Sequence, residues 1–160
     1  DPGDGTDDPD IDFSLAGFIY NNVTDANNTI PTQISGKDSD AGFDAVTLNI
    51  QAVRTSDDDP TVCQSIFGNG DVVTIQMGAE CKDPSNCSGS ELNIKNANLP
   101  AAGQDIDTSN DDASAQTVAS YEDIALVFGA NSDATISLNY PDAGSLELHA
   151  RYELLLDDGR

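Results

Sequence analysis

The chain has 160 residues, of which 29 are acidic and only 6 are basic, so its formal net charge at pH 7 is −23. This charge excludes nucleic acid as a natural partner, because phosphate binding requires a basic surface. It also disfavours anionic membranes, and it suits calcium, salty surroundings or plain solubility. No apolar run reaches the length of about 18 residues that would predict a membrane-spanning helix.

Residues 1–10 are rich in Asp, Pro and Gly and are predicted to form an acidic linker. Residues 11–160 fit a single domain by length. Residues 157–160 follow directly on a predicted strand. We therefore expect the chain to be a fragment of a longer polypeptide.

Alternating apolar side chains predict the first two strands. The first covers residues 11–19, and polar, loop-like stretches follow it up to residue 44. The second is a long strand over residues 43–55, which places on one face Val46, Leu48, Ile50 and Ala52. Residues 56–60 end this strand, because Pro60 donates no backbone hydrogen bond.

Residues 62–89 contain the clearest turn signal. The sequence Gly-Asn-Gly-Asp at 68–71 separates two runs of β-forming residues and predicts a tight hairpin turn. The run after it, residues 71–79, alternates, so Val73, Ile75 and Met77 are predicted to share one face of a strand.

The same stretch holds all three cysteines. Cys81 and Cys87 bracket Lys-Asp-Pro-Ser-Asn, a turn-forming sequence that returns the two sulfurs toward each other, so this pair is the favoured disulfide. Cys63 is either unpaired or a competing partner for one of them. A disulfide would place the chain in an oxidising, extracytoplasmic compartment.

The second half of the chain predicts further short strands. They cover residues 91–96, 124–128, 135–140 and 145–156, and the last has the cleanest alternation. A long polar connection, residues 97–116, separates the first two, and residues 117–123 could form a helical turn. Sustained helical periodicity is absent. The pattern predicts an all-β, immunoglobulin-like antiparallel sandwich of about seven to eight strands.

Acidic residues cluster in the predicted loops and raise the question of a calcium site. Calcium takes six to eight oxygen ligands, which loops at one end of a sandwich could supply. The candidate ligands are Asp38, Asp40, Asp105, Asp107 and Asp111. Their spacing lacks the Gly and the distal Glu of an EF-hand, so that motif is excluded, and solvated acidic loops are the competing interpretation.

Nothing in the sequence predicts an enzyme. The sole histidine, His149, lies on the polar face of the last predicted strand beside Glu147 and Arg151. No nucleophile neighbours His149, and the sequence contains none of the common catalytic motifs. We therefore expect a structural Glu–His contact and no catalytic residues.

Two runs resemble a domain of unknown function found in MshQ-like proteins of mannose-sensitive haemagglutinin pilus loci. They are the cysteine loop at residues 81–87, preceded by LNIQAVRT at 48–55 and by Cys63, and YPDAGSLELHARY at 140–152. The resemblance covers about residues 43–159. It implies a secreted or cell-surface protein of Gram-negative bacteria, tied to type IV-like pili, with no enzymatic activity and no binding residues to transfer.

Two functions follow as hypotheses. The first is a non-catalytic structural or adhesion module of a secreted, pilus-associated or cell-surface protein. Its expected partners are pilus or surface-protein subunits, which could join it by strand addition at a sheet edge. The alternative is a carbohydrate- or calcium-binding module of a larger adhesin or polysaccharide-active protein. A glycan site would need exposed aromatic rings, for which the candidates are Tyr20, Tyr121 and Tyr140. No organic cofactor is expected.

Overall fold

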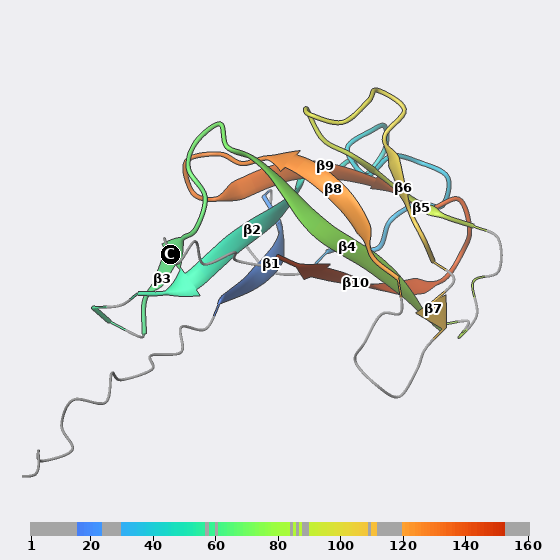
Figure 1. The fold of residues 1–160 in the computed structure, drawn as a ribbon. Helices are drawn as coiled ribbons and strands as arrows, with labels where there is room; N and C mark the ends of the chain where they lie inside the picture. The colour runs from blue at the N-terminus through green and yellow to red at the C-terminus, as the bar shows by residue number, and fades with distance from the viewer. Residues whose placement is uncertain are drawn as a thin grey trace, which may run out of the picture.

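The computed structural model describes residues 16–23, 30–56, 58–59, 61–83, 85, 87, 90–108, 110–111 and 120–152. These residues form ten strands, and none of them lies in a helix. The strands are arranged as two sheets (Figure 1), so the predicted all-β sandwich is confirmed. The strand number exceeds the expected seven to eight because three strands have only two or three residues, too few to show an alternation in the sequence.

The larger sheet begins at one edge with an antiparallel pair of strands from the first half of the chain. Its path is β1 (Ala16–Asn22), β2 (Leu48–Thr55), β9 (Asp133–Asn139), β5 (Leu92–Lys95) and β6 (Gln104–Ile106), and β3 (Cys63–Ser65) pairs with the end of β2. All of these neighbours are antiparallel. The sheet therefore combines strands from both halves of the chain.

The smaller sheet is centred on β4 (Val72–Asp83), the longest strand at 12 residues. Its antiparallel partners are β8 (Glu122–Val127) along the first half and β10 (Ser145–Arg151) along the second. The two-residue strand β7 (Asn110–Asp111) pairs with β4 in parallel. Every strand of this sheet thus depends on β4 for its pairing.

The core lies between the two sheets and comes from the apolar faces that the alternation predicts. In β4, Ile75 and Met77 are fully buried, as predicted, whereas Val73 is only half-buried. The facing layer comes mainly from β2, β9 and β5, through Leu48, Ile50, Ala52, Ala134, Ile136, Leu138, Leu92 and Ile94. Burying branched aliphatic side chains of this kind contributes about 1.5–3 kcal/mol each, which makes this layer the main source of stability.

The predicted hairpin at residues 68–71 is wrong. The turn itself is present, since the Asp71 amide donates to the Gly68 carbonyl at 3.2 Å. However, β3 before it pairs with β2 in the larger sheet, and β4 after it belongs to the smaller sheet. The turn therefore carries the chain from one sheet to the other, because β3 finds its partner in β2 and not in β4.

Several predicted strands have different ends. The second strand begins at Leu48 and not at residue 43, because Asp44 has a φ of 54°, which no extended strand accommodates. The first strand runs on to Asn22, and the long connection at 97–116 contains β6 and β7. Four predicted features fall wholly or partly outside the described residues. They are the linker and part of the first strand, within residues 1–15, part of the helical turn, at 117–119, and the end of the last strand, at 153–156.

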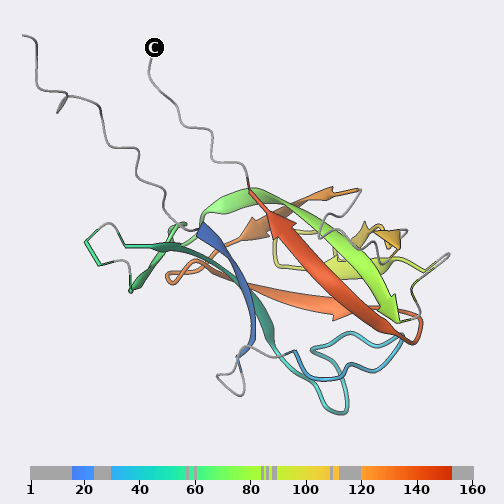
Figure 2. The same cartoon turned by 90° about the horizontal axis from the view of Figure 1, so that it is seen from below.

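The first and last described strands end up on the same side of the sandwich. Figure 2 shows the start of β1 and the end of β10 close together, although they belong to different sheets. Between them lies a cavity of about 210 Å³ lined by Phe18 of β1 and Ala150 of β10, together with Ile66, Phe67 and Tyr152. The two edges of the sandwich therefore meet around an apolar groove.

The turn between β5 and β6 gives a prediction about close packing. Gly103 has a φ of +79°, and a Cβ built there would lie 2.3 Å from Asn93 Oδ1 and 2.7 Å from the Ile94 carbonyl oxygen. Gly70 has a φ of +87° but nothing within 4 Å of such a Cβ. Gly70→Ala should cost about 1 kcal/mol from the backbone conformation alone. Gly103→Ala should cost about 2–4 kcal/mol, because the clash is added.

Urea unfolding followed by circular dichroism measures both variants. Equal losses in the two would contradict the close approach of Gly103 to β5.

Candidate functional site

Four polar side chains gather on the outer face of the smaller sheet. Along β4 the apolar positions point to the core, so Glu80 and Lys82 point away from it. In β10 the register places Glu147 opposite Glu80, and His149 opposite Gly78. We call Glu80, Lys82, Glu147 and His149 the Glu80 cluster.

The Glu80 cluster is held by short polar contacts. His149 Nε2 lies 3.0 Å from Glu80 Oε2. Lys82 Nζ lies 3.1 Å from Glu147 Oε2 and 3.6 Å from Glu80 Oε1. Like charges directly opposite each other destabilise a strand pair. The Lys82 ammonium group therefore compensates the two facing carboxylates, and the His149 imidazole forms a hydrogen bond with one of them.

Glu80 is the unusual member of the cluster. Its side chain is 4% exposed, against 17% for His149 and 52% for Glu147. Its Oε1 atom has no hydrogen-bond partner among the described residues. The sequence predicted a Glu–His contact for His149 but suggested Glu147 two residues away, whereas the hydrogen-bond partner is Glu80 on the neighbouring strand. Only the register of β4 against β10 identifies Glu80, and no local sequence signal gives that register.

The predicted calcium ligands Asp38 and Asp40 lie on the connection between β1 and β2, beside β9. Asp38 accepts from Lys95 Nζ at 2.5 Å and from Asn139 Nδ2 at 2.9 Å. Asp40 accepts from Ser137 Oγ at 2.7 Å. Lys95 and Asn139 donate to Asp38 and hold the pKa of its carboxyl below the ordinary value. Both carboxylates therefore anchor this connection to the larger sheet.

Of the other three candidates, Asp105 lies in β6, Asp107 directly after it, and Asp111 in β7. Asp105 accepts from Asn93 Nδ2 at 2.8 Å, and Asp107 accepts from Ser120 Oγ at 3.1 Å. Asp111 lies in β7, where only its backbone is described, opposite Cys81. Of the described His, Cys, Asp and Glu side chains, only Glu80, Glu147 and His149 bring three ligand atoms within 4.8 Å of one another. A calcium site in the acidic loops stays a prediction.

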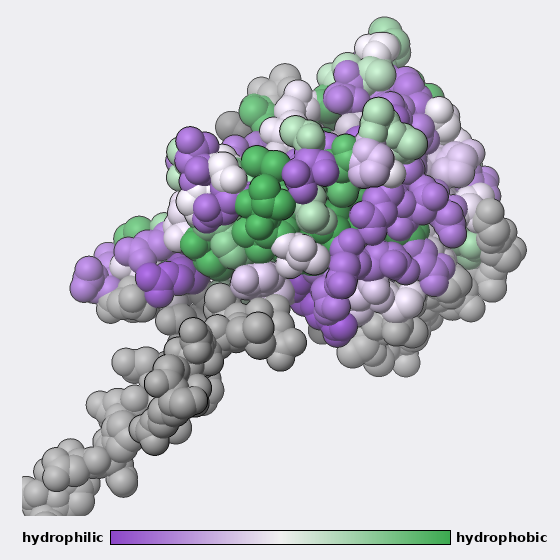
Figure 3. Space-filling model, turned by 45° about the horizontal axis from the view of Figure 1, so that its top comes forward, coloured by the Kyte–Doolittle hydropathy of each residue, from purple (hydrophilic) through white to green (hydrophobic). Residues whose placement is uncertain are grey.

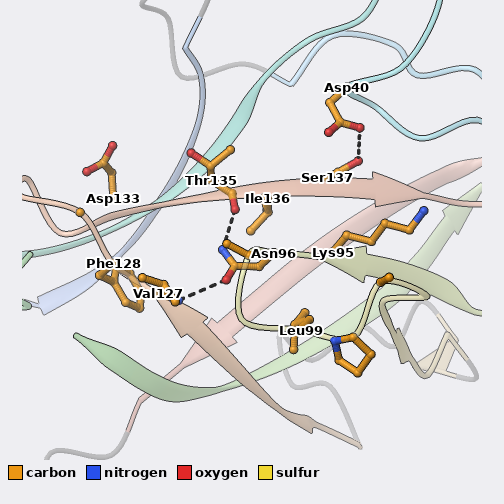
Figure 4. A pocket seen from close by; sticks show the side chains of 14 residues that line it. Asp40, Lys95, Asn96, Leu99, Val127, Phe128, Asp133, Thr135, Ile136 and Ser137 are labelled. Carbon is orange, nitrogen blue, oxygen red and sulfur yellow. Dashed lines mark hydrogen bonds between the residues drawn. The ribbon is translucent and has the colours of Figure 1, made fainter. Parts of the chain in front are cut away.

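A second cavity, of about 490 Å³, lies where β8 and β9 meet the turn after β5. Figure 4 shows the Asn96 side chain between β9 and the end of β8. Its Nδ2 donates to the Thr135 carbonyl at 2.7 Å, and its Oδ1 accepts from the Val127 amide at 3.2 Å. Asn96 thus joins the two sheets across this cavity.

Apolar side chains are visible at the surface as well. The space-filling view in Figure 3 shows them as a band across the middle of one face, with hydrophilic residues on both sides. The most exposed large apolar residue of the described part is Phe43, at 79%, on the connection between β1 and β2. Single exposed apolar residues are common on soluble domains, so neither feature defines a site alone.

The three tyrosines considered for glycan stacking are largely occupied by protein contacts. Tyr20 and Tyr140 pack against the core, and burial raises the pKa of both hydroxyls. The ring of Tyr121 carries the Arg151 guanidinium carbon 3.8 Å from its centre. A sugar would have to displace Arg151 to stack on Tyr121.

The disulfide predicted between Cys81 and Cys87 is present, with a Cα–Cα distance of 5.8 Å. Cys81 is the inward-facing residue next to Glu80, and both sulfur-bearing residues are buried. Cys63 is a free, exposed thiol on β3. The bond therefore fixes the end of β4 beside the Glu80 cluster.

The comparisons with known proteins identify the family. Residues 2–159 match the family described as "Domain of unknown function (DUF6701), first Ig-like domain". The chain belongs to this family. The match confirms the immunoglobulin-like fold and the predicted resemblance to a domain of unknown function, without showing the link to pilus loci. Neither a curated protein nor a solved structure matches the chain. In the described part of the chain, no helix has the length and hydropathy needed to cross a membrane.

The Asp38–Lys95 pair predicts a pH dependence of stability. The folded-state pKa of Asp38 lies below the unfolded value, so its contribution is complete above about pH 4 and is lost as the pH falls through the lower, folded-state pKa. Asp38→Asn should therefore cost up to about 1 kcal/mol at pH 7, with the cost shrinking toward zero near pH 2. Urea unfolding at several pH values measures it, with the exposed Glu91→Gln as the control. A cost that is the same at pH 7 and pH 2.5 would refute the assignment.

The structure predicts that loss of the disulfide lowers the free energy of unfolding of the domain. A loop with a sequence separation of 6 is expected to contribute about 2 kcal/mol by restricting the unfolded chain. A Cys81→Ala/Cys87→Ala variant should lose about that much free energy of unfolding. Cys63→Ser should change it by less than about 0.5 kcal/mol, because Cys63 is exposed. Equal losses in the two variants would exclude a stabilising role for the bond.

Proposed function

We propose that this domain is a non-catalytic structural or adhesion module of a secreted, pilus-associated or cell-surface protein. Its family membership and immunoglobulin-like fold support a structural module. The disulfide supports an oxidising compartment outside the cytoplasm. The proposed partners are pilus or surface-protein subunits. The observation that supports this part is a difference between the sheet edges: side chains cover the backbone of one edge strand, whereas another has neither charged residues nor proline.

The edge of β8 is occupied by side chains. Three residues of the connection and strand after β5 reach its backbone at alternate positions. Asn96 Oδ1 accepts from the Val127 amide at 3.2 Å, Asn98 Nδ2 donates to the Ala125 carbonyl at 3.5 Å, and Gln104 Nε2 donates to the Asp123 carbonyl at 2.8 Å. An incoming strand would have to replace these bonds, so this edge is protected against strand addition.

In the described part of the chain, no side chain bonds in this way to the backbone of β1 from Ala16 to Asn21. There, β1 pairs with β2 and with no other strand. Its sequence, AGFIYNN, has neither a charged residue nor a proline. By contrast, the edge strand β10 carries Glu147, His149 and Arg151. Charge and proline are the usual means of blocking an edge, so β1 is the edge best suited to accept a strand.

The apolar groove beside β1 gives an added strand something to bind besides backbone. It lies between the two sheets and is lined by aromatic rings of Phe18, Phe67 and Tyr152. Phe67 contacts both Phe128 and Tyr152, with ring centres 4.7 and 5.2 Å apart. In strand addition, backbone bonds supply affinity and pockets for alternate side chains supply specificity. The proposed partner is therefore an extended segment with apolar side chains at alternate positions.

Gly17 allows a sharp test of the β1 edge. A Cβ at this position would meet nothing within 4 Å, and its backbone is not in the left-handed region, so larger residues should not disturb the fold. Gly17→Lys adds a charge to the edge and should weaken the attachment of the full-length parent protein to surface appendages. Less of the parent protein should then be found in the appendage fraction that is sheared from the producing cells. Immunoblots of that fraction measure the decrease, which we expect to be about tenfold or more, equivalent to about 1.4 kcal/mol.

Three controls make the result specific. Gly17→Ala should behave as the wild type, and so should Ser145→Lys, which adds the same charge to the start of β10. The purified Gly17→Lys domain should melt within a few degrees of the wild type. Surface recovery of Gly17→Lys equal to that of the wild type would reject the β1 edge, and absence of the wild-type protein from the surface fraction would reject a surface location.

The alternative of a glycan- or calcium-binding module has less support. The three candidate tyrosines are packed or covered by Arg151, and the four candidate aspartates with described side chains accept hydrogen bonds from protein donors. A glycan would thus have to compete with Arg151, and calcium with those donors.

A further inference from the structure

We propose that the Glu80 cluster is a binding site for a divalent transition cation of the zinc type. The ligands are the Glu80 and Glu147 carboxylates and the Nε2 atom of His149, whose ligand atoms all lie within 4.8 Å of one another. An imidazole nitrogen and carboxylate oxygens are all ligands that zinc accepts, and three protein ligands leave a fourth position for water. The site is separate from the β1 edge and does not depend on the function proposed above.

The strands hold these ligands in place. Glu80 and Glu147 are direct cross-strand neighbours, and His149 follows two residues later on the same face of β10. The register shifts between Ser145 and Leu146, where Cys81 pairs with Leu146 and Asp83 with Ser145, which leaves Lys82 as the additional residue of a bulge. Bulges alter the direction of side chains and are frequent beside functional sites.

The buried Glu80 oxygen is the independent observation that points to a cation. Glu80 is almost fully buried, yet its Oε1 atom has no hydrogen-bond partner among the described residues and is met only by the Lys82 ammonium group, in an ion pair of 3.6 Å. Leaving a buried charged acceptor unsatisfied costs at least as much as a lost hydrogen bond. A cation coordinated by both Glu80 oxygens and by Glu147 would satisfy Oε1 and also remove the repulsion between the facing carboxylates.

The ligand chemistry selects the metal. Calcium and magnesium prefer oxygen ligands, whereas zinc and its neighbours accept an imidazole nitrogen. Tetrahedral zinc with bonds of about 2.0–2.1 Å needs ligand atoms about 3.4 Å apart. His149 Nε2 and Glu80 Oε2 are already 3.0 Å apart. Glu147 is half-exposed and can approach by a change of rotamer.

Lys82 now occupies the place next to both carboxylates and competes with the cation. Its Nζ atom contacts Glu147 and Glu80 at 3.1 and 3.6 Å. Arg151, the other nearby cation on β10, points instead to Gln76 Oε1 at 2.7 Å and to the Tyr121 ring. The metal therefore has one ammonium group to displace, and the net charge of −23 favours that exchange by attracting cations to the surface.

Zinc titration by isothermal calorimetry in 150 mM NaCl tests the site, in a Cys63→Ser background that removes the exposed thiol as a ligand. One equivalent should bind. His149→Ala should weaken binding at least about tenfold, and Lys82→Met should tighten it about tenfold because the competing charge is gone. The control is Glu122→Gln, which removes an exposed carboxylate from β8 and should leave the affinity unchanged.

Two further measurements keep the test independent of folding defects. Excess zinc should raise the melting temperature of the parent domain and not that of His149→Ala. Cobalt should give the intense visible absorption of a four- or five-coordinate site, and His149→Ala should abolish it. Equal zinc affinity in His149→Ala and the parent, or a pale octahedral cobalt spectrum, would show adventitious binding to the acidic surface and overturn the proposal.

Discussion

The pairing of β4 on both of its edges is the constraint on which the rest of the structure depends. Through one edge β4 holds β8, and through the other it holds β10, so the smaller sheet would have no continuous path without it. Its inner face supplies fully buried Ile75 and Met77 to the core, and its outer face supplies Glu80. The disulfide then ties Cys81, the last buried residue of β4, to Cys87. One strand thus joins core, cross-link and polar cluster.

The two sheets are joined by polar side chains as well as by the apolar core. Asn96 spans from β9 to β8, and the buried Ser132 hydroxyl donates to the Phe67 carbonyl at 2.6 Å while accepting from the Phe67 amide. These four bonds satisfy backbone groups, and those at Phe67 and Val127 lie where the chain leaves one sheet for the other. Buried backbone groups without partners are costly, so these side chains allow the crossings to lie close to the core. Asn96 is also one of the residues that close the β8 edge.

The sequence predicted those features that depend on local alternation or on a short loop. Strand β4, its buried Ile75 and Met77 and the Cys81–Cys87 bond follow from residues that are neighbours in the chain. The hairpin at residues 68–71 was wrong because turn residues specify the turn and not the sheet to which each flanking strand belongs. Glu80 was missed for a related reason. A glutamate on the polar face of a strand is assigned to solvent, and only the β10 register shows that it is buried.

The acidic composition predicted an affinity for cations but not its place. The carboxylates of Asp38 and Asp40 on a connection, and of Asp105 in β6, accept hydrogen bonds from protein donors, so they hold neighbouring segments together. The proposed cation-binding site lies instead where β4 and β10, two strands from distant parts of the chain, pair with each other. Strand β10 takes part in both proposed sites, because His149 belongs to the Glu80 cluster and its neighbour Ala150 lines the groove beside β1. Since adjacent residues of a strand point to opposite faces, any displacement of β10 would alter both surfaces together.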